Sequence, residues 1–227
     1  LSRGLGDVYK RQFRNTTNFL NNKFILDTSA NYIIQNDKNM VSQGQYFNPL
    51  TSLYLFPRGE DFSDVTVYER YDDLSGVNTQ YWPYGDLGGV SSQNPYWIMN
   101  RMNRENDRRR YKLAASLQYN IIDGLNVQGR VSIDNTESKY TEKFHAGTVG
   151  NFAGSKGRYK EENRLDRQVY ADVLANFNKT FNEFNVTANL GASIKDLRME
   201  LTSLHGDLNN VTNHFTIENL TRSGYYK

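Results

Sequence analysis

The feature that most constrains the fold is a regular alternation of apolar and polar residues along several segments of the chain. It is clearest in Leu125–Asp134, where Leu, Val, Gly, Val and Ile alternate with Asn, Gln, Arg, Ser and Asp. Successive side chains of a β-strand point to opposite faces, so this pattern gives one apolar and one polar face. On a helix the same residues would be scattered around every face. The alternation predicts these strands: Phe24–Gln35, Tyr111–Ile122, Leu125–Asp134, Val169–Asn178 and Phe184–Lys195.

The connections between these segments alternate in length. Asp123-Gly124 and Lys179–Glu183 are short, whereas residues 36–108 and Thr136–Gln168 form long polar connections. Short turns, long loops and strands near the ~9–11 residues that a tilted strand needs to cross a bilayer are typical of an up-and-down transmembrane barrel. We therefore expect an all-β fold, an antiparallel up-and-down transmembrane β-barrel fragment of about five to six strands. It should not close alone, and residues 36–108 should form a long extracellular loop.

The same alternation predicts which residues of the central hairpin share a face. One apolar face should carry the following side chains: Leu113, Leu117, Tyr119, Val127, Val131 and Ile133. Arg130 should lie on the opposite, polar face. Aromatic residues near the strand ends fit the interfacial girdles of membrane barrels.

A soluble antiparallel sandwich is the alternative fold, because it also has one buried and one solvated face. Three features favour the barrel: long rows of Asn, Gln, Ser and Asp on the polar faces, apolar faces rich in Ala and Gly, and alternating loop lengths. The functional counterpart of the sandwich is a non-transporting surface or soluble adhesin or lectin-type binding module.

Composition narrows the classes of protein further. The mean hydropathy is −0.74 and no run of ~18 apolar residues occurs, which argues against helical membrane spans. The net charge is +2 with both signs well mixed, so nucleic acid is not an expected partner. Cysteine is absent, which excludes disulfides and thiolate metal sites. We expect no cofactor.

The first residues, 1–12, do not continue the alternation and lack the apolar core of a signal peptide. They resemble a spurious leader found in reading frames translated from metagenomic assemblies. We interpret residues 1–12 as such a leader or a disordered tail, and residues 13–227 as part of the barrel.

The segment 45–104 carries a family resemblance. The motifs that support it are Asn48-Pro49-Leu50, the run LYLFPRG at 53–59, Asn94-Pro95-Tyr96-Trp97, and the Arg-rich segment that leads into the DGLNVQG hairpin. Together they resemble the SusC/RagA family of TonB-linked (TonB-dependent) outer-membrane receptors of Bacteroidetes, from about Asn22 onward. The resemblance implies a large barrel of 22 strands with a plug, driven by the TonB complex in the Gram-negative outer membrane. It also implies a SusD-like surface lipoprotein as partner and glycan or peptide nutrients as substrates. No plug or TonB-contacting segment is recognisable here, so no energy-coupling residue is assigned.

Aromatic residues of the long loop are the candidates for contact with substrate or partner. Aromatic rings can stack on sugar faces or on a partner protein, but a loop this long must also pack on itself if it is ordered. Self-packing is the favoured interpretation. The candidates are Tyr54, Phe56, Tyr81, Trp82, Tyr96 and Trp97.

No catalytic or metal-binding pattern stands out, and we do not expect an enzyme. His145, His205 and His214 are isolated in the sequence and are predicted to be solvated. The acidic residues between Glu60 and Asp73 lack the ordered spacing of a calcium loop, so a solvated acidic loop is expected.

Overall fold

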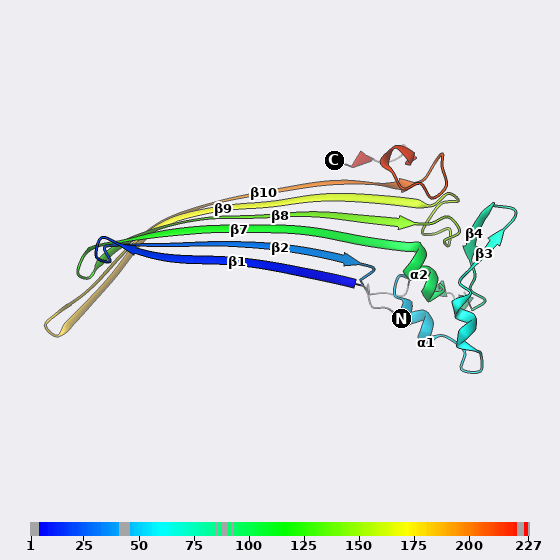
Figure 1. Ribbon diagram of the computed structural model, residues 1–227, viewed down its shortest axis with the longest axis horizontal. Helices are drawn as coiled ribbons and strands as arrows, with labels where there is room; N and C mark the ends of the chain where they lie inside the picture. Colours follow the sequence, from blue (N-terminus) through cyan, green and yellow to red (C-terminus); the bar gives the residue numbers. More distant parts are fainter. Residues whose placement is uncertain are drawn as a thin grey trace.

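The computed structural model describes residues 5–40, 46–84, 86–87, 90–91, 93–221 and 225–226. Its main feature is an open antiparallel sheet in which each long strand pairs with the next long strand along the chain (Figure 1). The strands, in sheet order, are β1 (Leu5–Phe19), β2 (Phe24–Lys38), β7 (Met102–Ile122), β8 (Leu125–Phe144), β9 (Arg158–Phe181), β10 (Phe184–Asp207) and the short β11 (Tyr225–Tyr226). The expected fold class, an up-and-down antiparallel sheet that does not close, is confirmed.

The turns that join β1 to β2, β7 to β8 and β9 to β10 lie at one end of the sheet, and the long connections lie at the other (Figure 1). Gly124 has a φ of +83°, and a Cβ there would lie 2.4 Å from the carbonyl oxygen of Asn178. Only glycine fits this position, because any other side chain would meet that backbone. Leu20, Asn21 and Asn22 adopt positive φ in the β1–β2 turn, and Asn182 does so in the β9–β10 turn. Asparagine tolerates this left-handed region better than most residues.

The strands are longer than the alternation predicted. β8 has 20 residues and β9 has 24. The long connections therefore span residues 39–101 and 145–157, rather than 36–108 and 136–168. Near the loops both faces of β7 are polar, as in Asp107–Arg110, so hydrophobic alternation disappears there while backbone pairing continues.

Residues 5–12, which we interpreted as part of a spurious leader or a disordered tail, form a paired strand and are not a disordered tail in the structure. β1 includes Leu5–Gln12 and pairs with β2 along its whole length, from Leu5 opposite Lys38 to Phe19 opposite Phe24. The segment escaped the pattern because charged residues occupy both of its faces. Polar side chains do not prevent pairing, since the strand's hydrogen bonds come from its backbone.

The predicted register of the central hairpin is confirmed. Tyr119 lies opposite Val127, and Leu113 lies opposite Ile133. Directly opposed residues share a face, and neighbours along a strand do not. Arg130 therefore lies on the other face from Val131, where it meets Ser116 and Asp172 of the adjacent strands.

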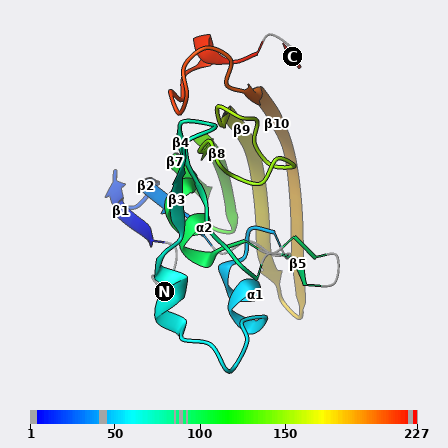
Figure 2. The ribbon, with the colours of Figure 1, turned by 90° about the vertical axis from the view of Figure 1, so that its right-hand side faces the viewer.

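The outer face of the sheet, defined as the face that carries Val131, holds a band of exposed apolar side chains. On β2 the band runs from Phe24 to Tyr32, a rise of about 27 Å along the strand. A tilt of about 40° reduces this height to about 21 Å, close to the ~25 Å apolar band of outer-membrane barrels. Viewed along the strands, the sheet bends into an arc (Figure 2), which suits part of a barrel wall.

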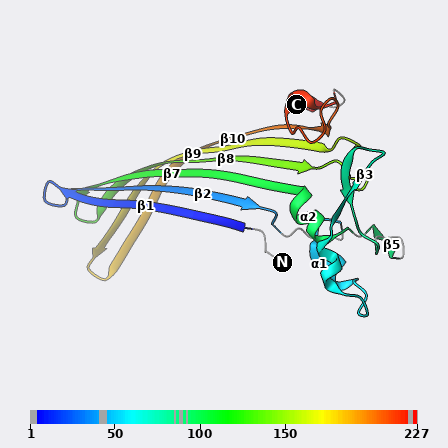
Figure 3. The ribbon, with the colours of Figure 1, turned by 45° about the vertical axis from the view of Figure 1, so that its right-hand side comes forward.

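The connection 39–101 folds into a compact unit at the loop end of the sheet (Figure 3). Its elements are α1 (Pro49–Tyr54), the 3₁₀ helix η1 (Phe62–Thr66), β3 (Glu69–Asp72), β4 (Val77–Gln80), β5 (Asp86–Leu87), β6 (Val90–Ser91) and α2 (Pro95–Arg101). A further 3₁₀ helix, η2 (Ile217–Asn219), follows β10. Among the described residues, no helix is long and apolar enough to cross a membrane.

The two Asn-Pro pairs start helices. The Asn48 side chain accepts from the Leu50 amide at 3.0 Å, and the Asn94 side chain accepts from the Tyr96 amide at 2.8 Å. Asparagine is a preferred N-cap, and proline suits the first helical position because its missing N–H has no partner there anyway. Sequence motifs that could have been simple turns therefore begin α1 and α2.

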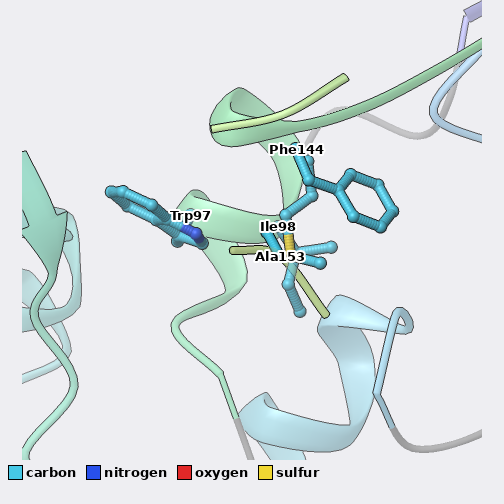
Figure 4. Packing of buried hydrophobic residues seen from close by; sticks show 5 residues of the cluster. Trp97, Ile98, Phe144 and Ala153 are labelled. Atoms are coloured by element: carbon cyan, nitrogen blue, oxygen red, sulfur yellow. The ribbon is translucent and has the colours of Figure 1, made fainter. Parts of the chain in front are cut away.

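A small hydrophobic core lies between this unit and the ends of β7 and β8 (Figure 4). Its buried members are Trp97, Ile98, Met102, Phe144 and Ala153. Asn94, which is 1% exposed, also ties the unit together. Its side-chain amide donates to the carbonyl oxygens of Val65 at 2.9 Å and Tyr81 at 3.2 Å.

The two ends of the connection are joined at Asn39, directly after β2. The Asn39 amide donates to the Arg104 carbonyl at 2.8 Å, and its side-chain oxygen accepts from the Arg104 amide at 2.8 Å. Its side-chain nitrogen donates to the Met99 carbonyl at 2.7 Å. Asn39 thus links the start of the connection to its end through three hydrogen bonds.

Candidate functional site

The inner face of the sheet, which carries Arg130, is largely polar apart from Leu197, Met199 and Leu201 of β10, and ion pairs cross-link its neighbouring strands. Arg14 meets Asp27 at 2.7 Å between β1 and β2, and Arg110 meets Asp134 at 2.6 Å between β7 and β8. Arg130 of β8 meets Asp172 of β9 at 2.8 Å, with the Asp172 side chain only 5% exposed. Charged pairs at such positions fit a hydrated lumen, because each charge has an opposite partner and the groups remain near water.

Above these pairs, towards the loops, the inner face forms a cleft of about 640 Å³. It is lined by Asp37, Met40, Arg104, Glu105, Asn106, Arg108, Thr136, Ser138, Tyr140, Glu162, Arg164 and Asp166. The lining thus contains three arginines and four carboxylates. A cleft with both signs of charge suits a ligand that carries both signs or many hydrogen-bonding groups.

Two groups that line this cleft are incompletely partnered. Nε of Arg104 and Oδ1 of Asp166 are buried without a hydrogen-bond partner. The remainder of each group is held in place: Arg104 donates through Nη2 to the Phe47 carbonyl at 3.3 Å, and Asp166 accepts through Oδ2 from Arg164 at 2.8 Å. A buried polar atom without a partner is unfavourable, so a free donor and a free acceptor here favour the binding of a polar ligand or ordered water.

Tyr140 contributes a fixed hydroxyl to the wall of the same cleft. Its hydroxyl donates to Oε1 of Glu142 at 2.7 Å. Burial, together with this carboxylate, raises the pKa of Tyr140 well above its ordinary value. Tyr140 therefore remains protonated across the physiological pH range.

The structure packs most of the predicted loop aromatics against other residues of the loop. Phe56 contacts the rings of Phe62, Trp82 and Tyr84, at centroid distances of 5.6, 6.5 and 5.2 Å. The Tyr81 ring lies under the Arg70 guanidinium, 3.3 Å from its centroid, and Tyr96 stacks on Tyr68 at 6.4 Å. Self-packing, the favoured interpretation of these residues, is what the structure shows.

The prediction that Trp97 contacts a substrate or partner is wrong. It is completely buried, and its indole nitrogen donates to the Thr148 hydroxyl at 3.1 Å. A large aromatic side chain in a polar loop can pack in a small core as well as on a binding surface, and Trp97 packs in the core. Tyr54 is the candidate that stays open to contact, since it is 89% exposed at the end of α1.

The prediction for the histidines holds for His214, which is exposed, but is wrong for His145. Nδ1 of His145 lies 2.9 Å from the Arg101 carbonyl and must donate to it, and its ring packs against Phe215. Burial lowers the pKa of His145 below its ordinary value, which keeps the ring neutral at neutral pH. Within the described ranges no three His, Asp or Glu side chains are placed to hold a metal ion.

The acidic residues of the loop have structural partners. Asp61 caps η1 by accepting from the Ser63 amide at 2.9 Å, and Asp72 accepts from the Leu74 amide at 3.2 Å in the β3–β4 turn. The Ser63 amide lowers the pKa of Asp61, and hydrogen bonds from the Ser75 side chain and the Leu74 amide lower the pKa of Asp72, since they favour the charged carboxylate.

Trp97→Ala should loosen the 39–101 unit without abolishing the sheet. Removal of a fully buried tryptophan typically destabilises a core by about 3–5 kcal/mol, and this core is small. The loop should therefore be cut much faster by protease added to membranes that contain the full-length protein. Tyr54→Ala, at an exposed position, is the matched control and should stay within about 0.5 kcal/mol of the native loop. Equal cleavage of the two variants would contradict the role of the Trp97 core.

The comparisons with known proteins identify the fold alone. No protein-family model and no curated protein matches the sequence. The "open-open" state of the RagAB peptide importer and the structure of the RagAB peptide transporter each align with a TM-score of 0.66 at 12% identity, over 99% of this chain. The "closed-closed" state of the RagAB peptide importer aligns with a TM-score of 0.62 at 14% identity, over 96% of this chain. This chain shares its β-fold with part of each matched chain. It covers 24% of the length of each matched chain.

Proposed function

We propose that this chain is part of the wall and outer loops of a TonB-dependent importer of the SusC/RagA type in the Gram-negative outer membrane. In this proposal it binds and admits nutrients together with a SusD-like surface lipoprotein, and it catalyses no reaction. Energy from the TonB complex would enter through other parts of the protein.

The observation that carries the proposal is the division of one sheet into an exposed apolar band and a charged inner face. Leu190 and Ile194 are 78% and 71% exposed on the outer face. On the inner face, Arg130 and Asp172 form an ion pair only one register step from Val131. In water the band would be unfavourable, whereas in a bilayer it faces hydrocarbon and the ion pairs face the lumen.

The cleft favours peptides over neutral glycans as the substrate class within this proposal. Its arginines and carboxylates could pair with both ends and with charged side chains of a peptide. The likeness to structures named as peptide importers supports the same choice. Sugars would make more use of stacked aromatic rings, and the loop aromatics are largely engaged with one another.

Cysteines introduced at two adjacent positions test which face of the sheet meets lipid. This chain contains no cysteine, so Val131→Cys and Ser132→Cys can be made in the full-length protein once any other cysteines are replaced. In outer-membrane vesicles a charged maleimide should label Ser132→Cys at least about tenfold faster, because hydrocarbon excludes the reagent from Val131→Cys. Both should label equally after denaturation. Equal labelling in intact vesicles would contradict the membrane-spanning proposal.

Uptake measurements separate transport from the adhesin alternative. A bulky maleimide on Ser132→Cys should obstruct the lumen and reduce uptake of labelled peptides or glycans by cells. Substrate binding at the surface with no uptake, before or after modification, would instead favour a non-transporting binding module.

A further inference from the structure

On the outer face, beyond the apolar band, one row of side chains carries several arginines, and we call it the boundary row. Its members, from β1 to β10, are Arg11, Tyr32, Tyr111, Asn135, Arg167 and Arg198. The row on its turn side is apolar apart from Asp196. The row on its loop side mixes Arg109, Glu137 and Glu200 with the less polar Tyr9, Ile34 and Leu165. The boundary row itself carries arginines and no carboxylate.

The boundary row includes two arginines that face each other. Arg167 of β9 lies directly opposite Arg198 of β10. Like charges at directly opposed positions destabilise a sheet, unless an anion lies between them. Nε of Arg198 donates to Glu200 at 2.6 Å on its own strand. The Arg167 side chain has no hydrogen bond or ion pair within the described part of the chain. The acid on the turn side, Asp196, lies opposite Val169 and also forms no ion pair with described residues.

The tyrosines place the boundary row at a membrane interface. Tyr32 and Tyr111 lie opposite each other and are 42% and 41% exposed. Tyrosines at this position of a membrane barrel lie at headgroup level, with the ring on hydrocarbon and the hydroxyl in the polar layer. Arg167 and Arg198 are then at the depth of the lipid phosphates, on the side that faces lipid.

We propose that the boundary row binds the phosphate groups of anionic lipid in the outer leaflet, with Arg167 and Arg198 as the principal donors. Guanidinium groups match phosphate oxygens through paired N–H donors. A phosphate between these two side chains would relieve their mutual repulsion. The inference rests on the proposed membrane orientation and adds a lipid site that is separate from the inner cleft.

The test titrates the purified full-length barrel in neutral detergent with phosphorylated lipid A and with dephosphorylated lipid A. The native protein should bind the phosphorylated form more tightly. Arg167→Gln with Arg198→Gln should reduce that preference by about twenty-five-fold, because each interfacial arginine contributes about fivefold. Arg108→Gln with Arg164→Gln is the matched control: both residues lie on the inner face, opposite Ser138. It removes the same charge and should leave lipid preference unchanged.

Three results would overturn the inference. The preference could survive in the Arg167 and Arg198 variant, it could fall equally in the inner-face control, or millimolar inorganic phosphate could abolish lipid binding. The last result would assign the site to free phosphate. The cysteine labelling at positions 131 and 132 is independent of lipid phosphate. Protection of Val131→Cys without any lipid preference would therefore overturn this inference and leave the proposed function standing.

Discussion

Val131→Arg in the full-length protein should sharply reduce the amount of assembled barrel in the outer membrane. Val131 lies in the middle of the apolar band, 47% exposed, between Ala115 and Ala171 of the neighbouring strands. An arginine on the lipid face near the bilayer midplane costs about 2–4 kcal/mol. The measurement is the yield of heat-modifiable barrel in outer-membrane fractions.

Two further arginine substitutions separate a bilayer from a soluble core, which would also be damaged by Val131→Arg. Leu125→Arg places the charge on the same face beside the β7–β8 turn, where the penalty in a bilayer falls to about 0–1 kcal/mol. Ser132→Arg places it on the polar inner face, opposite Ala114 and Tyr170, and should leave assembly nearly intact. Equal losses at Val131 and Leu125, or a larger loss at Ser132, would reject the proposed orientation.

The 227-residue piece expressed alone should accumulate in inclusion bodies. The outer edge of β1 has no pairing strand among the described residues, and β10 meets β11 over only two residue pairs. The apolar band adds exposed side chains such as Phe184 at 76% and Leu190 at 78%. Unpaired edges and a large apolar surface together favour aggregation.

The matched control is the full-length protein purified in detergent, which should remain soluble because the barrel is complete and its band is covered. A monodisperse, cooperatively melting monomer of the 227-residue piece in detergent-free buffer would be decisive evidence against a lipid-facing band.

The middle of the sheet could be predicted from the sequence because one face there is apolar and the other is polar. Leu125–Asp134 shows this contrast at every residue, and the predicted register is found in β8. The strand ends could not be predicted in the same way. Arg108 and Arg109 of β7 point to opposite faces, yet both are charged and exposed, so the sequence contains no contrast that marks them as strand.

The candidate site was harder to predict for the same reason. Arg104, Tyr140 and Asp166 line one cleft but belong to β7, β8 and β9. Only the register across three strands brings them together, and those residues fall in segments that the alternation assigned to loops. Asn94-Pro95 was visible as a motif, but its role as helix cap and hydrogen-bonding centre depends on Val65 and Tyr81, which are distant in sequence.

The closure at Asn39 makes the 39–101 unit separable from the sheet that carries it. The unit begins and ends on two strands that already pair, β2 and β7, so the barrel register is set below it and not by its length. The entropic cost of a longer closed loop grows only with the logarithm of its length. An insert held in this way can be exchanged or enlarged while the hydrogen bonds of the underlying sheet stay as they are.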